Sequence, residues 1–425
     1  MDDHRPEKQH NLFRSLLALL GPGLFLIGYN IGTGSVTTMA SAGSRWGMQL
    51  TWVVLLSCVF VFFGVALFGR YTLATGETIL YAIRRHFRFG AAISLFIMAS
   101  VILGEFAGVA GMTALMVDIL REWIERLWGS SFEGLPLVLT LAICATVFLV
   151  LWNGKYAFLE ALLALLVGVM GFCFLVTAML LVPSWRGILA GLAPGIPKEP
   201  DAAMIVAGMA GTTFSAAMLY CRSITIKAKG WGPKEEGRAW VDAGVSAVSM
   251  LFLSIAVMIC AAGTLYVAGK PVQETVDMVR TLEPLAGQFA LSLFVVGLVG
   301  AGLSSLIPTI LIAPWLISDY RGKPIDPKSS VSRLFVVLGV GFGFTGPFID
   351  IKPVALMVAT MALLAIVLPF STIAITVLLN QKHVGALKNT LPLNLICLAA
   401  VAFSLVMSYH GVIGFIEAVE KMLIT

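Results

Sequence analysis

The chain has 425 residues, of which 59% are hydrophobic and only 12% are charged, and its formal net charge is +5. A soluble protein could not cover that much apolar surface with so few charged side chains, so the composition excludes a soluble globular domain. It predicts an all-α protein that crosses the membrane many times. The six cysteines lie in or at the ends of apolar runs without metal-ligand spacing, which favours buried thiols over disulfides.

Residues 1–14 are polar and are expected to form a cytoplasmic tail. Apolar stretches follow, each close to the roughly 20 residues that a helix needs to cross a bilayer. The loops between them are short and leave no room for a separate soluble domain. The eleven predicted spans are 15–44, 48–70, 91–117, 135–152, 158–182, 202–226, 240–268, 286–318, 331–348, 354–380 and 391–416.

The positive charges are unevenly distributed over the connecting segments. With the N-terminus inside, 19 of the 28 Lys and Arg residues fall on the inner side. This bias predicts a cytoplasmic N-terminus, and an odd number of spans then places the C-terminus outside. The expected location is the plasma (inner) membrane. Because the net charge follows from topology, the lipid bilayer is the expected macromolecular environment and no nucleic-acid partner is predicted.

Two of the predicted spans are interrupted by glycine and polar residues. The first contains NIGTGS at 30–35, and the sixth contains GTTFSAAM at 211–218. Matching breaks in spans one and six predict two five-helix halves of opposite topology, 15–182 and 202–380, followed by an extra helix at 391–416. In transporters built this way, the unwound segments face each other near the membrane midplane and bind the substrate.

The chemistry of the first break indicates a ligand site. Gly32 and Gly34 let a ligand approach the main chain, where N–H groups attract a carboxylate and carbonyl oxygens attract a cation. Glycines can instead merely allow close helix packing, but that alternative leaves Asn30, Thr33 and Ser35 without a purpose in lipid. Neither break contains a carboxylate or a histidine, which argues against a tight divalent-cation site.

Three stretches resemble the Nramp family of proton-coupled divalent-metal transporters. GPGLFLIGYNIGTGSVTTMASAGSRWGMQLTW (21–52) is similar to the family's first helix, GTTFSAAMLYCRS (211–223) to helix 6 and GAGLSS (300–305) to helix 8. The resemblance covers most of the chain. It implies the inverted-repeat fold of the sodium-coupled leucine transporter, with eleven membrane helices, helices 1 and 6 broken, and a monomeric state.

The family's metal-binding motifs are replaced in this sequence. The D-P-G-N motif falls on Gly-Thr-Gly-Ser at 32–35, and the M-P-H motif falls on Ser-Ala-Ala at 215–217. A second helix-6 histidine, linked to proton movement in the family, aligns with Arg222. Glu105 matches the first of the family's acidic residues on helix 3, whereas the later ones have no acidic counterpart. The metal function therefore does not transfer residue by residue, and no metal ligands are predicted.

The GTGSV sequence instead resembles the G-x-G break of amino-acid transporters of the same superfamily, where helix-1 amides receive a substrate carboxylate. We therefore expect a secondary-active transporter that moves a small polar organic solute by alternating access, coupled to Na⁺ or H⁺. The alternative is a divalent cation, Mg²⁺ or Mn²⁺, at an atypical site. A membrane sensor is a third hypothesis. The chain has no paired catalytic residues or nucleotide loop, which argues against an enzyme.

The predicted site residues come from both breaks and from the segments that resemble helices 3 and 8. The substrate site is expected to comprise Asn30, Gly32, Thr33, Gly34, Ser35, Thr213, Phe214, Ser215 and Ala217. Similarity to sodium-coupled transporters implies a coupling-ion site, without any other cofactor, made by Gly28, Ile31, Ala301, Ser304 and Ser305. Adjacent serines often bond only their own helix, so a structural role stays open. Glu105 and Arg222 are candidates for proton transfer or gating, and a structural role for Glu105 also stays open.

Overall fold

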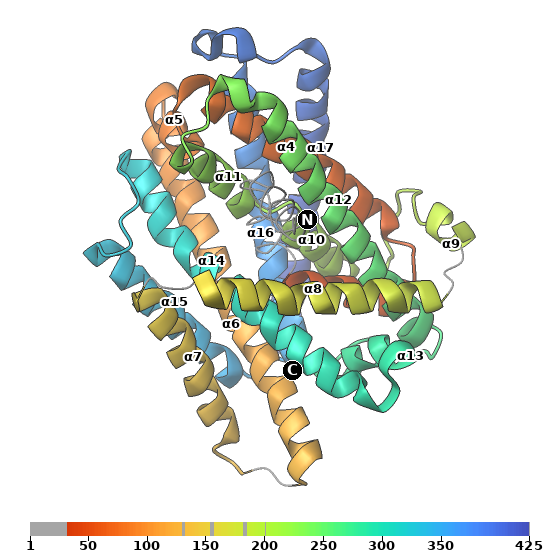
Figure 1. Ribbon diagram of the computed structural model, residues 1–425. Coiled ribbons are helices and arrows are strands. Elements are labelled where there is room, and N and C mark those ends of the chain that lie inside the picture. Colours follow the sequence, from red (N-terminus) through yellow and green to blue (C-terminus); the bar gives the residue numbers. More distant parts are fainter. Residues whose placement is uncertain (1–31, 130–131, 154–156, 182–184, 200, 425) are drawn as a thin grey trace, which may run out of the picture.

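The computed structural model describes residues 32–129, 132–153, 157–181, 185–199 and 201–424, and these form helices and connecting turns without a strand (Figure 1). Short 3-10 or π turns are η1 (Pro233–Glu235), η2 (Ala262–Tyr266), η3 (Thr275–Leu282), η4 (Gly287–Phe289), η5 (Gly346–Phe348) and η6 (Lys382–Leu387). The α-helices are α3 (Thr33–Trp46), α4 (Thr51–Thr75), α5 (Ile79–His86), α6 (Gly90–Trp128), α7 (Leu135–Asn153), α8 (Ala157–Leu180), α9 (Trp185–Ala190), α10 (Ala202–Thr213), α11 (Ala216–Ala228), α12 (Glu236–Ala261), α13 (Glu283–Ala286), α14 (Ala290–Arg321), α15 (Ser330–Thr345), α16 (Pro353–Leu379) and α17 (Leu391–Ile424).

The helices follow the predicted spans closely. Nine helical segments of the described residues are long and apolar enough to cross a membrane, and a shorter apolar stretch, Val167–Leu180, lies in α8. The first predicted span, 15–44, falls partly outside the described residues, and α3 is its second half. The prediction of a polytopic all-α membrane protein is therefore confirmed.

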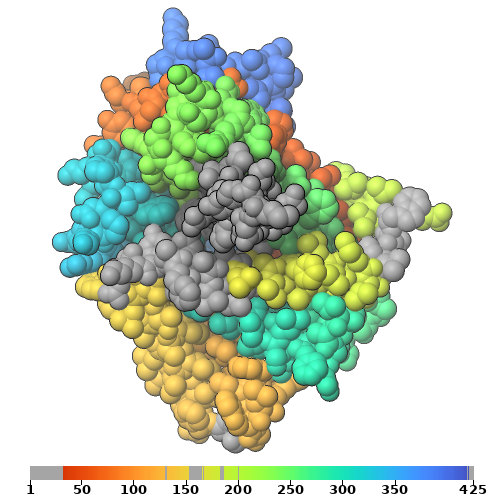
Figure 2. All heavy atoms as spheres, in the orientation of Figure 1, coloured from red at the N-terminus to blue at the C-terminus, as the bar shows by residue number. Residues whose placement is uncertain are grey.

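The centre of the bundle is the pair α10–α11. In its apolar window 94% of the residues are buried, compared with 22% in α17, which carries exposed leucines at Leu391, Leu395 and Leu398. Figure 1 shows α10 and α16 inside the ring of other helices, with α8 crossing the front, and the described part of α8 lies on the surface in Figure 2. Central helices therefore bury their side chains against protein, whereas peripheral helices present apolar side chains to lipid.

The sixth predicted span is broken as the sequence indicates. Helix α10 ends at Thr213 and α11 begins at Ala216, with Phe214 and Ser215 in non-helical backbone conformations between them. Because two residues leave the helical path, the amides at the start of α11 and the carbonyls at the end of α10 lose their usual partners within the helix. The prediction of a break within 211–218 is confirmed.

The described half of the first span begins inside the predicted break at 30–35. Gly32 is the residue before α3 and has an extended backbone. A Cβ atom on Gly32 would collide with the side chain of Ser305 in α14, so only glycine lets the two segments approach this closely. The half-helix expected before Gly32 lies outside the described residues.

Candidate functional site

A small cavity lies where the start of α3 meets the break between α10 and α11. Its walls come from α3, α6, α10, α14 and α16, and its volume of about 20 Å³ is enough for one water molecule, which needs about 10–15 Å³ by the same measure. The lining residues are Gly32, Gly34, Ser35, Glu105, Met112, Gly211, Thr212, Ser215, Ser305, Thr309, Met361 and Leu364.

The two broken spans touch each other at this cavity. The hydroxyl groups of Ser35 in α3 and Thr212 in α10 are hydrogen bonded at 3.1 Å, and either can donate. A Cβ atom on Gly34 would lie 2.7 Å from Met361 Sδ and 3.2 Å from Thr212 Oγ1, so a side chain at this position would have to displace its neighbours. The glycines of the first break therefore bring the main chain of α3 up to α10, α14 and α16.

Two hydroxyl groups of the cavity wall have no hydrogen-bond partner among the described residues. The Oγ atoms of Ser215, at the α10–α11 break, and of Ser305, in α14, are buried and unpartnered. Most buried polar atoms in proteins are hydrogen bonded, so such exceptions need a physical reason. Their place on the cavity wall makes both oxygens available to a bound ligand.

Glu105 is the acidic side chain of the cavity. It lies in α6, its exposed fraction is 3%, and it is the only carboxylate among the described lining residues. A carboxylate inside a membrane bundle is costly and usually marks a pathway or a binding partner. Two methionines, Met112 of α6 and Met361 of α16, line the same wall, and Met361 Sδ lies beside Gly34.

The predicted site residues separate into three groups. Gly32, Gly34, Ser35, Ser215, Ser305 and Glu105 line the cavity. Thr33, Thr213, Phe214, Ala217, Ala301 and Arg222 are buried but are not among the lining residues, and Ser304 is half-buried. Gly28, Asn30 and Ile31 lie outside the described residues.

The two serines predicted for the coupling ion behave differently. Ser304 donates its hydroxyl to the carbonyl of Ala301, one turn earlier in α14, at 2.9 Å. Ser305 instead faces the cavity and the position of Gly32. The hydroxyl of Ser304 and the carbonyl of Ala301 thus bond each other within the helix, whereas Ser305 shares the cavity with the predicted substrate residues.

The sequence interpretation missed six of the lining residues. Thr309 follows Ser305 by four residues in α14, so the helical period could have placed it on the same face. Thr212 lies beside the predicted Thr213. Gly211 begins the predicted break at 211–218 but was not named as a site residue. The other three, which carried no polar signal, are Met112, Met361 and Leu364.

Arg222 lies in a different environment. Its side chain is fully buried, forms a short ion pair with Asp242 of α12 and donates a hydrogen bond to the Ala239 carbonyl at 3.0 Å. A buried guanidinium needs such partners, because an unpaired charge inside the bundle would be very costly. Arg222 therefore joins α11 to α12.

Comparison with known proteins decides the family. Residues 23–414 match the family described as natural resistance-associated macrophage protein-like, or Nramp. The chain belongs to the Nramp family. It is 27% identical to the divalent metal cation transporter MntH of Nostoc sp., with 91% of this chain and 88% of that protein covered. It is also 27% identical to MntH of Brucella suis, with coverage of 89% and 84%.

Solved structures support the Nramp assignment at the level of the fold. The manganese transporter of Eremococcus coleocola, in complex with a bis-isothiourea compound, has a TM-score of 0.72 and 16% identity, with 97% of this chain and 88% of that chain covered. MhsT bound to L-phenylalanine has a TM-score of 0.58 and 14% identity, with coverage of 94% and 98%. The leucine-transporter-type fold predicted from the sequence is therefore confirmed.

Membership of the Nramp family makes this protein a multi-pass membrane transporter and not an enzyme. The sequence predictions of a multi-pass integral membrane protein and of secondary transport are confirmed to that extent, and the plasma-membrane location stays a prediction. The orientation of the termini, the division into halves at 15–182 and 202–380, and the monomeric state stay predictions.

Proposed function

We propose that this Nramp transporter moves a divalent metal cation, Mn²⁺ or Mg²⁺, which is the alternative substrate that the sequence left open. The observation that carries this proposal is the buried carboxylate of Glu105 in the wall of the cavity. The relatives from Nostoc and Brucella suis, which match most of the chain, are named divalent metal cation transporters. The organic solute expected from the glycine-rich break has no support from these relatives.

The donor atoms of the cavity suit a hard or borderline cation. Glu105 offers a carboxylate, and Ser35, Thr212, Ser215 and Ser305 offer neutral oxygens, the ligand type that Mg²⁺ and Mn²⁺ prefer. The two breaks contain no acidic side chain, whereas Glu105 comes from α6. The replaced motifs therefore leave a cation site with a single charge, which suits a transporter because a cation held by several carboxylates would be released slowly.

The thioethers favour Mn²⁺ over Mg²⁺. Met112 and Met361 bring sulfur to the cavity from α6 and α16 rather than from the broken sixth span. Sulfur is a poor ligand for the hard Mg²⁺ ion and a better one for softer transition-metal ions. We expect Mn²⁺ to be transported at lower concentrations than Mg²⁺.

The size of the cavity also favours an ion. About 20 Å³ accommodates one water-sized body, so a cation would bind with most of its water shell replaced by protein oxygens. Even the smallest amino acid is several times larger than a water molecule. An organic solute would require the walls formed by α3 and α16 to move apart.

The same geometry favours H⁺ as the coupling ion. Ser305 lines the substrate cavity, and the hydroxyl of Ser304 is bonded to the Ala301 carbonyl, so the described members of the predicted Na⁺ site do not surround a second ion position. Glu105 is a carboxyl group that can take up a proton when no metal is bound. A metal ligand must be deprotonated, so cation and proton would compete for this side chain.

The test is uptake into proteoliposomes that contain the purified protein and a metal-sensitive dye. We expect Mn²⁺ influx that depends on a pH gradient and is unchanged when Na⁺ is replaced by K⁺. Glu105→Gln should lower this influx roughly tenfold or more, because the cavity loses its charged ligand. The control is Glu122→Gln, which removes a carboxylate at the end of the same helix, where it pairs with Arg126 at 2.8 Å.

Two outcomes would contradict the proposal. The first is uptake of an amino acid or organic acid, measured with radiolabelled solutes, together with no uptake of Mn²⁺ or Mg²⁺. The second is equal Mn²⁺ influx through the wild type and Glu105→Gln, which would place the cation pathway away from this cavity.

A further inference from the structure

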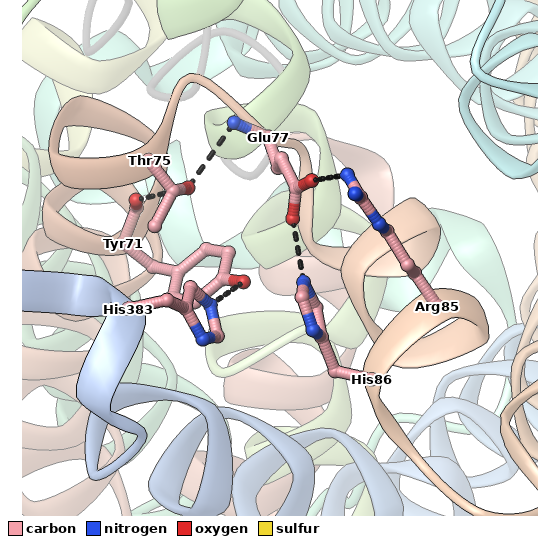
Figure 3. A network of polar contacts seen from close by, with 6 residues as sticks. All are labelled: Tyr71, Thr75, Glu77, Arg85, His86 and His383. Atoms are coloured by element: carbon pink, nitrogen blue, oxygen red, sulfur yellow. Dashed lines mark hydrogen bonds and ion pairs between the residues drawn. The ribbon is translucent and has the colours of Figure 1, made fainter.

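A second group of metal-ligating side chains lies at the helix ends, away from the cavity. We call Glu77, His86 and His383 the His–Glu cluster: Glu77 lies in the turn between α4 and α5, His86 ends α5, and His383 lies in η6 (Figure 3). One ligand atom from each lies within 4.8 Å of the others. His86 Nε2 and Glu77 Oε2 are 2.9 Å apart.

We propose that the His–Glu cluster binds a divalent transition-metal ion of the Zn²⁺ type, at a site separate from the transport cavity. Two imidazoles and one carboxylate form a donor set that Zn²⁺ accepts, with a fourth position left for water. Nitrogen donors distinguish this cluster from the cavity, where oxygen and thioether donors line the wall. Mg²⁺, which prefers oxygen ligands, is not expected to bind here.

Binding requires a small rearrangement. Zn²⁺–N bonds of about 2.0–2.1 Å place tetrahedral donors roughly 3.3 Å apart, so the ligand atoms must move closer together. The rings of His86 and His383 are stacked, with centroids 4.3 Å apart and an angle of 15° between their planes. An imidazole binds a metal in its own plane, so one ring must turn. His383 is the exposed member, and therefore its ring is the one that turns.

One neighbouring group holds Glu77 in place, and a second contacts His383 in the position from which its ring has to turn. Arg85 donates to Glu77 Oε1 at 2.6 Å, which leaves Oε2 directed at His86, and the Tyr71 hydroxyl is 2.9 Å from His383 Nε2 (Figure 3). Partners of this kind orient metal ligands and are part of most metal sites. Arg85 also places a positive charge beside the ion, which weakens binding and makes the site reversible.

A bound ion would connect two parts of the transport machinery. The turn before α5 is attached to the end of α14, because Thr78 hydrogen bonds to Asp319 and Arg84 donates to the Tyr320 carbonyl at 2.7 Å. η6 follows α16, and both α14 and α16 line the cavity. An ion in the His–Glu cluster would therefore restrain these helices relative to each other and slow transport. This effect on transport rests on the proposed function, whereas binding of Zn²⁺ does not.

The experiment is calorimetric titration of the purified full-length protein with Zn²⁺. We expect Zn²⁺ to bind the His–Glu cluster of the wild type, and the affinity of this site to fall roughly tenfold or more in His86→Ala and in His383→Ala. His410→Ala, which removes a histidine of α17, should bind Zn²⁺ as the wild type does, and Glu105→Gln, which alters the cavity, should keep the Zn²⁺ site that His86→Ala and His383→Ala weaken. Equal affinity in all variants would overturn the proposal, and a loss confined to Glu105→Gln would place the ion in the cavity instead.

Two further measurements keep the test independent of folding defects. Arg85→Gln should tighten Zn²⁺ binding, because it removes the competing charge and keeps a hydrogen-bond donor; unchanged or weaker binding would count against the site. In the wild type, Zn²⁺ should protect His383 but not His410 from diethyl pyrocarbonate, as followed by mass spectrometry of the peptides. Equal modification of His383 with and without Zn²⁺ would overturn the proposal. Neither result depends on whether Mn²⁺ is transported.

Discussion

Buried polar groups have different partners in the cavity and in the region where α11 packs against α12. In the cavity, the hydroxyls of Ser215 and Ser305 have no partner among the described residues. In the other region, Arg222 is neutralised by Asp242 and also bonded to the Ala239 carbonyl. Both places are buried, so burial alone does not distinguish binding from support. The two unpartnered hydroxyls lie on a cavity wall where a ligand can reach them, whereas the charges of Arg222 and Asp242 are paired with each other and join α11 to α12.

The largest expected effect is the loss of stability when the ion pair between Arg222 and Asp242, which joins α11 to α12, is broken. Asp242→Asn leaves the Arg222 charge buried without its anion, which should cost about 3–5 kcal/mol of stability. Thermal unfolding in detergent should show a much lower midpoint, together with a smaller amount of folded protein. Ser215→Ala, which removes an unpartnered hydroxyl of the cavity wall, should leave the midpoint nearly unchanged, in contrast to Asp242→Asn.

The double variant Arg222→Met with Asp242→Leu provides the control for that prediction. Replacing both charges by apolar side chains removes the unpaired charge, so most of the lost stability should return. If the double variant unfolds as early as Asp242→Asn, the ion pair is not the reason for the loss.

An intermediate effect is expected at Gly32, where α3 meets α14. A Cβ atom would collide with Ser305, so Gly32→Ala should cost about 1–3 kcal/mol by overpacking and should reduce Mn²⁺ influx, since the new methyl group points at the cavity wall. The matched control is Gly168→Ala in α8, where nothing lies within 4 Å of the added atom.

A double variant tests whether contact with Ser305 causes the loss of stability in Gly32→Ala. Adding Ser305→Ala to Gly32→Ala removes the Oγ atom and should recover most of the lost midpoint, with the Cβ atom of residue 305 still 3.0 Å from the added methyl position. Influx should stay low because a cavity oxygen is gone. Equal loss of stability in Gly32→Ala and Gly168→Ala would show that close approach to α14 is not what requires glycine at position 32.

The sequence predicted the spans and the break at 211–218, because apolar length and helix-breaking residues are local properties. It did not predict which side of α10 faces the cavity: Thr213 was expected and Thr212 lines the wall. Neighbouring residues of a helix differ by about 100° in direction, so this choice depends on tertiary packing. Met112 and Met361 carried no signal, since methionine is common in any apolar core.

The smallest expected effect separates the two adjacent serines of α14. Ser305→Ala removes one neutral ligand and should weaken the binding free energy of Mn²⁺ by about 0.5–1.5 kcal/mol. The Mn²⁺ concentration for half-maximal uptake should therefore rise a few-fold. Ser304→Ala should have no such effect, because its hydroxyl already bonds the Ala301 carbonyl. Both curves are measured with Na⁺ and with K⁺. A Na⁺ dependence that disappears in Ser304→Ala would restore the coupling-ion site inferred from the sequence, and would mean that Ser304 leaves Ala301 to bind an ion during the transport cycle.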